Sequence, residues 1–160
     1  MNGIIVIGVG NPFRRDDGLG PAVITRLRAR DLPGATLATS LGETGDLIDL
    51  WDGAELALVV DAIRSSPAHP GRVHRLTVGQ LSGERARAAS SHGMDLGEAV
   101  ELARELGRLP VRLVLYAVEA GDVGFGLDLT PAVERAVAHL ADEITTVVWA
   151  TQRTRRAQVA

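Results

Sequence analysis

The chain alternates between short unbroken apolar runs and segments in which apolar residues recur every three or four positions. Three runs are the clearest: residues 4–8, 55–60 and 112–118. A continuous run of this length, rich in β-branched residues, predicts a strand buried on both faces, as in a parallel sheet. A weaker run over residues 35–41 predicts a further strand, and the more polar stretch RVHRLTV predicts an edge strand.

The segments between these runs carry helical patterns. Apolar residues recur every fourth position over residues 19–27, which predicts a helix with one apolar stripe. A short helix is expected after the second strand, with Thr44 as its N-cap. Another helix is expected from Leu96 to a closing Gly107.

The last helix has the longest stripe and is expected over residues 131–150. Thr130 stands where an N-cap belongs, and Pro131 suits the first turn. The polar tail, residues 151–160, is expected to fray.

Strands that alternate with helices predict an α/β fold: a three-layer sandwich with a twisted, mostly parallel central sheet and helices on both faces. We expect one such domain over residues 1–150.

Composition narrows the class of protein. A chain of 160 residues with 46% hydrophobic residues fits one soluble domain with a single core. The net charge of -3 gives no reason to expect nucleic acid or an anionic membrane as a partner. The N-terminal apolar run is too short for a signal peptide or a membrane span, so we expect a cytoplasmic protein, and we expect it to be a monomer.

Two residue types are missing, and their absence excludes some chemistry. The chain has no cysteine, which rules out disulfides, thiolate metal sites and cysteine nucleophiles. All 17 basic residues are arginine, so neither a P-loop lysine nor a Schiff-base lysine is available.

The first strand leads into GVGNPFRRDDGLG, which begins like a nucleotide-binding turn. The third glycine of a dinucleotide site is missing, and Asp16 and Asp17 would repel a phosphate there. Glu43, after the second strand, could still stand for the acid that binds a ribose. The two aspartates could also simply favour a helix N-terminus, each by ~0.3–1 kcal/mol.

A third acid, Asp61, ends the strongest apolar run. Sites in α/β sheets form beyond the carboxyl ends of the strands, so Asp16, Asp17 and Asp61 are expected to converge at one edge. His92 ends a serine- and glycine-rich loop before a helix. Two carboxylates and an imidazole are a plausible divalent-metal site. The structural alternatives are a turn-capping aspartate and a histidine with no role.

The other three histidines carry weaker expectations. His139 lies opposite the apolar stripe of the last helix and should face solvent. His69 sits between prolines in a loop and has no evident role. His74 is in phase with Leu76 in the edge strand and should be half-buried.

With these residues placed, the chain resembles the hydrogenase maturation endopeptidases, which process the large subunit of nickel–iron hydrogenases. Five stretches carry the resemblance, in the family's order over residues 4–150: GVGNPFRRDDGLG, GETG, VVDAI, SSHGMDL and GLDLTPAV. The first is specific, because GxGN followed by DDGxG is rare. The others are short and count mainly as a set.

The resemblance implies removal of a C-terminal extension from the large-subunit precursor after nickel insertion. It implies an α/β sandwich and a precursor as partner. It assigns metal binding to Asp17, Asp61 and His92, with the substrate's own nickel as the metal and no organic cofactor. Asp17 and Asp61 are then the catalytic acids, and Asp16 is a hypothetical base for a metal-bound water.

The sequence departs from the family at Glu43, where many relatives have glycine, and at Asp95, where some do. Neither change removes a predicted ligand, and the added charge of Glu43 could tune which precursor is accepted. Two other functions stay open: a nucleotide-binding Rossmann-like domain, and a non-catalytic chaperone that senses nickel insertion.

Overall fold

A single five-stranded sheet forms the centre of the molecule. The structure is a computed structural model, and it describes residues 3–81 and 93–160. The strands are β1 (Ile4–Val9), β2 (Ala35–Ser40), β3 (Leu56–Ile63), β4 (Val73–Thr77) and β5 (Arg112–Glu119). Their order is β2-β1-β3-β5-β4, and all neighbours are parallel except β4 and β5. The mostly parallel sheet and the polar edge strand are as the sequence predicts.

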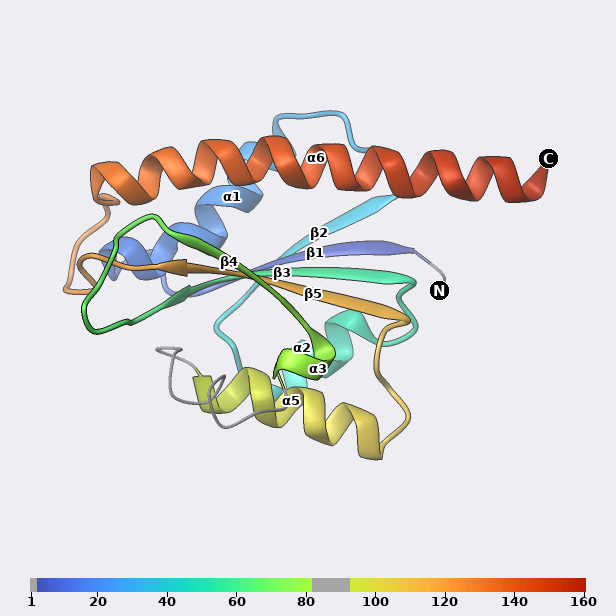
Figure 1. The fold of residues 1–160 in the computed structure, drawn as a ribbon, viewed down its shortest axis with the longest axis horizontal. Coiled ribbons are helices and arrows are strands. Elements are labelled where there is room, and N and C mark those ends of the chain that lie inside the picture. Colours follow the sequence, from blue (N-terminus) through green and yellow to red (C-terminus); the bar gives the residue numbers. More distant parts are fainter. Residues whose placement is uncertain (1–2, 82–92) are drawn as a thin grey trace.

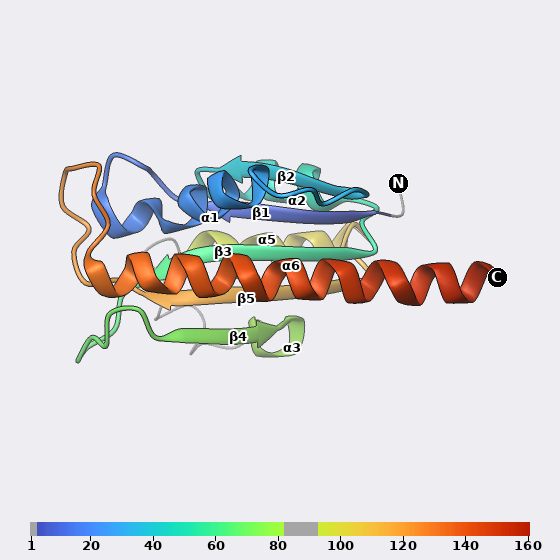
Figure 2. The ribbon, with the colours of Figure 1, turned by 90° about the horizontal axis from the view of Figure 1, so that it is seen from above.

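Helices cover both faces of this sheet. Within the described residues they are η1 (Arg15–Gly18, a 3-10 turn), α1 (Leu19–Arg28), α2 (Thr44–Trp51), α3 (Val78–Leu81), α5 (Gly93–Glu105) and α6 (Pro131–Val159). Figure 1 shows α1 and α6 on one face and α2, α3 and α5 on the other. Seen from above, α6 runs lengthwise along β3 and β5, while α1 lies over β1 and β2 (Figure 2). The predicted three-layer α/β sandwich is confirmed.

The core consists of two apolar layers, one on each side of the sheet. In β3, Leu58 and Val60 pack toward α1 and α6, whereas Ala57 and Val59 pack toward α2 and α5. Because side chains alternate along a strand, β3 is buried on both faces, as its unbroken apolar run predicts. The same alternation puts Asp61 on the α2 and α5 side.

Helix starts differ from the sequence prediction in their details. Thr44 is the first residue of α2 and Glu43 is its N-cap, so Thr44 does not cap that helix. Thr130 occupies the N-cap position of α6, but its side chain makes no capping bond there. Its hydroxyl donates to the buried carboxylate of Asp16 at 2.8 Å.

The last helix is longer than predicted and ends at Val159 rather than Ala150. The apolar stripe that set the prediction stops at Val148, but the following residues contain no glycine or proline and include good helix formers. Arg155 also pairs with Glu55 at 3.0 Å, which ties this turn to the body. The predicted polar tail is therefore helical, and Figure 1 shows it extending past the sheet.

None of the helices within residues 3–81 and 93–160 is long and apolar enough to cross a membrane.

Candidate active site at the carboxyl edge of the sheet

The glycines of the first turn allow three backbone segments to pack closely. A Cβ on Gly8 would lie 2.3 Å from the Gly20 carbonyl oxygen, so α1 rests directly on β1. Gly10 has a φ of +139°, and a Cβ there would lie 1.9 Å from the Asp17 carbonyl oxygen. Only glycine fits at these contacts. The Gly-x-Gly pattern thus serves the packing of β1 against η1 and α1, whereas the nucleotide interpretation needs that space for pyrophosphate.

The turn after β1 brings two neighbouring acids into the interior. Asp16 and Asp17 are 0% and 2% exposed, although they are adjacent in the chain. The Asn11 backbone N–H donates to Asp17 Oδ2 at 2.9 Å, which orients this carboxylate. Arg15 takes a left-handed conformation with a φ of 44°, which is uncommon for a residue other than glycine. The backbone path is thus shaped so that both acids turn inward.

Asp16 binds the loop that leads into α6. Its Oδ2 accepts hydrogen bonds from the backbone N–H groups of Gly121 and Asp122, at 2.7 and 3.0 Å. Thr130 donates to it twice, from its N–H to Oδ1 at 2.7 Å and from its hydroxyl to Oδ2. A carboxylate with four donors is well compensated for burial. This geometry favours a structural role for Asp16, and its role as a base stays a prediction.

Asp61 lies near the carboxyl end of β3, which is flanked by β1 and β5. Its side chain is 2% exposed, and its Oδ1 accepts a hydrogen bond from the Ala62 N–H at 2.8 Å. The η1 turn that carries Asp17 packs against β3. Asp17, in the turn after β1, and Asp61, near the end of the neighbouring strand β3, therefore lie at one edge of the sheet. Buried carboxylates from two elements are the oxygen donors that a divalent cation prefers.

The third predicted ligand, His92, lies outside the described residues. Within the described part of the chain, no three histidine and acidic side chains gather closely enough to hold a metal ion. The predicted set of Asp17, Asp61 and His92 thus stays a prediction.

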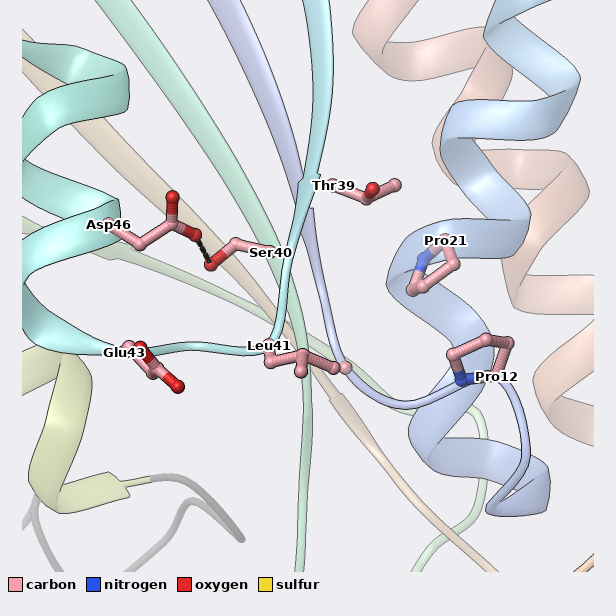
Figure 3. A pocket seen from close by; sticks show the side chains of 8 residues that line it. Pro12, Pro21, Thr39, Ser40, Leu41, Glu43 and Asp46 are labelled. Atoms are coloured by element: carbon pink, nitrogen blue, oxygen red, sulfur yellow. Dashed lines mark hydrogen bonds between the residues drawn. The ribbon is translucent and has the colours of Figure 1, made fainter.

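A cavity of about 380 Å³ opens beside this edge, between the first turn and the end of β2. Its walls include the apolar Pro12, Pro21 and Leu41 as well as the carboxylates of Glu43 and Asp46 (Figure 3). The hydroxyl of Ser40 bonds to Asp46, as the dashed line in Figure 3 marks. Glu43, whose charge the sequence places near the site, is thus one wall of a cavity at the carboxyl edge.

A buried acid that the sequence analysis missed lies at the end of β5. Glu119 is 2% exposed and hydrogen-bonds His74 Nε2 at 2.9 Å and the His69 N–H at 3.1 Å. Burial alone would raise its pKa, but these bonds and one from Ser65 hold the pKa of Glu119 below its usual value.

The available signal for Glu119 was the one that pointed to Asp61, an acid closing an unbroken apolar run. Glu119 also gives the loop histidine a structural partner, through the backbone of His69. His74 is partly buried in the edge strand and His139 is exposed on α6, as predicted.

Comparisons with known proteins identify relatives along most of the chain. A family model described as hydrogenase maturation protease matches residues 42–147. The chain is 25% identical over 143 residues to a hydrogenase 2 maturation protease of Escherichia coli, covering 88% of this chain and 87% of that protein. It is 30% identical over 147 residues to the hydrogenase expression/formation protein HupD of Bradyrhizobium diazoefficiens, covering 88% and 75%.

Solved structures share the fold of this chain. The hydrogenase maturating endopeptidase HybD from Escherichia coli superposes with a TM-score of 0.80 at 22% identity, covering 94% of each chain. The nickel–iron hydrogenase maturation protease HybD from Thermococcus kodakarensis has a TM-score of 0.76 at 21% identity, covering 92% of this chain and 99% of that one.

Proposed function

Because the chain belongs to the hydrogenase maturation protease family, we propose that it is an endopeptidase that removes the C-terminal extension of a nickel–iron hydrogenase large-subunit precursor after nickel insertion. One observation supports the assignment of this activity to particular residues. Asp17 and Asp61 are both buried at the carboxyl edge of the sheet, on neighbouring elements.

In this proposal the carboxylates of Asp17 and Asp61, with His92, bind the nickel that the precursor carries. Nickel accepts imidazole and carboxylate ligands, so the residue types suit the ion. A bound cation polarises a carbonyl group and lowers the pKa of a water molecule. The chain's own part is to orient the two carboxylates, as the Asn11 N–H does for Asp17.

The test is to incubate the protein with nickel-loaded and nickel-free precursor and to follow the mass of the precursor. Loss of the C-terminal extension from the nickel-loaded form alone supports the proposal. Tight binding of the loaded precursor with no mass loss would indicate a chaperone instead. Equal cleavage of both forms would contradict nickel recognition, and absence of both binding and cleavage would contradict the whole proposal.

The proposal also assigns a setting to the reaction. The protein acts in the cytoplasm, as a monomer on one precursor, with no role for nucleic acid or membrane. The net charge of -3 supports the absence of a nucleic-acid or membrane partner, because a negatively charged polymer or surface would be repelled.

A further inference from the structure

Large apolar side chains are exposed around the carboxyl edge. Within the described residues, Phe13 and Leu41 are 63% and 62% exposed, and Phe125 and Leu127 are 90% and 70% exposed. We call these four residues the apolar rim. They come from three loops, which follow β1, β2 and β5. An apolar group of this kind at a site is typical of a surface that binds another protein.

The three loops are held next to one another. The Gly126 N–H donates to the Phe13 carbonyl oxygen at 2.9 Å, and the Arg15 N–H donates to the Gly126 carbonyl oxygen at 3.0 Å. Phe13 therefore lies beside the segment that carries Phe125 and Leu127. On the other side of the first turn, Leu41 and Pro12 line the same cavity, and Figure 3 shows Leu41 extending toward Pro12.

The loop that presents Phe125 and Leu127 is held by hydrogen bonds to buried and neighbouring residues. Asp16 receives three backbone N–H bonds and one hydroxyl bond from this loop. Arg14 Nε donates to the Val123 carbonyl oxygen at 3.2 Å, and the Gly124 N–H donates to Asp122 Oδ1 at 2.8 Å. An exposed aromatic side chain on a fixed loop loses little conformational entropy on binding, which is the property of a preorganised contact.

The rim lies beside the turn that carries two of the candidate acids. Phe13 precedes Asp16 and Asp17 by three and four residues in the same turn, and the cavity wall joins Leu41 to that turn. A protein substrate whose bond is cut near Asp17 and Asp61 would lie next to the turn that carries Phe13. This proximity favours the protein substrate as the occupant over a partner that binds elsewhere.

We propose that the apolar rim is the docking surface for the precursor, and that it contacts an apolar segment of that protein next to the bond to be cut. This inference rests on the proposed function, because it takes the protein substrate from it. It assigns Phe125 and Leu127 to substrate affinity and gives them no part in the chemical step.

The test compares a double variant, Phe125→Ala with Leu127→Ala, with the wild-type protein. Cleavage of nickel-loaded precursor is measured across precursor concentrations, and binding is measured directly in the Asp61→Asn background to prevent turnover. We expect KM and Kd to rise at least tenfold, while kcat at saturation and the melting temperature stay unchanged. Aromatic anchors at the centre of an interface typically have effects of this size.

The matched control is Val111→Ala, because Val111 is 82% exposed but lies before β5, at the opposite edge. It should leave KM and Kd unchanged. Unchanged affinity in the rim variant would overturn the inference. So would a wild-type dimer that the rim variant dissociates while precursor affinity is kept, because the rim would then bind a second copy. A wild-type protein that binds without cutting would contradict the proposed function alone, since the affinity comparison still applies.

Discussion

The two edges of the sheet differ in whether their polar side chains are buried or exposed. All five buried polar residues of the described chain lie at the carboxyl ends of strands or in the turn that follows: Asp16, Asp17, Ser40, Asp61 and Glu119. At the amino edge, charges remain on the surface. Arg108 pairs there with Asp49 and Asp52, both at 2.9 Å. Surface pairs cost little to form and contribute little, whereas a buried carboxylate must be compensated by donors or by a cation.

Two of the buried acids at the carboxyl edge form hydrogen bonds to loops that are distant in the sequence. Asp16 and Glu119 bind loops that are distant in sequence: Asp16 holds the segment before α6, and Glu119 holds the segment before β4. Asp17 and Asp61 accept bonds from backbone groups six and one residues away. Asp16 and Glu119 thus connect distant segments of the chain, and Asp17 and Asp61 are the two acids that are proposed to act in catalysis.

The largest expected effect is on catalysis at Asp61. Asp61→Asn should lower kcat/KM for nickel-loaded precursor by at least about a hundredfold, because even groups that only support a metal ligand contribute 10–100-fold. The amide keeps its oxygen for the Ala62 N–H, so the melting temperature should stay nearly the same. Rates are measured by mass spectrometry and stability by thermal unfolding.

His139→Ala is the control for that experiment, because His139 is exposed on α6. It should leave both rate and stability unchanged. Full cleavage by Asp61→Asn would make Asp61 an ordinary strand-ending acid.

The second largest effect is on stability, at Asp16. Asp16→Asn turns one acceptor oxygen into a donor that faces N–H groups, which should cost about 3 kcal/mol. For a domain of this size that lowers the melting temperature by roughly 6–12 °C. The folded fraction should keep its cleavage rate, as measured well below the melting temperature. A stable Asp16→Asn protein without activity would instead support the base hypothesis.

A smaller effect should appear at Glu119 in acid. The pKa of Glu119 is lowered in the folded protein, so its ionised form adds stability at pH values above its unfolded pKa, and that stability is lost as pH falls through the folded pKa. The free energy of unfolding from urea titrations is compared between wild type and Glu119→Gln from about pH 7 down to about pH 3. The two curves should converge toward acid. Parallel curves would mean that Glu119 is not the group that titrates.

The smallest effect should come from the amino edge. Arg108→Gln removes both surface pairs with Asp49 and Asp52, and we expect no measurable change in melting temperature or in cleavage. A clear loss of stability would show that charges at the exposed amino edge contribute as much to stability as the buried charges at the carboxyl edge.

The fold could be predicted because its signals are local. The run LALVV is buried on both faces of β3, and the alternation of strands and helices determined the layers. The end of α6 was missed because an apolar stripe marks only the part of a helix that packs. Residues 151–159 have no such stripe, and pairs such as Arg155 with Glu55 depend on tertiary structure.

The candidate site was predictable only in part, for a related reason. The topology rule placed Asp17 and Asp61 at one edge, and the structure agrees with that placement. The same rule could not separate Asp16 from Asp17, because the difference lies in which donors face each carboxylate. The partners of Asp16 are more than a hundred residues away in the chain, and no sequence pattern predicts such contacts.

The helix α6 begins at the loop of the rim and ends on the far side of the molecule, as Figure 1 shows. A straight helix of 29 residues is about 44 Å long at 1.5 Å per residue. A fluorophore or surface anchor attached beyond Val159 would therefore stand well away from the carboxylates and the apolar side chains around them. Immobilised in that way, every molecule on a sensor surface would direct its carboxyl edge toward the solution, where a large protein substrate can reach it.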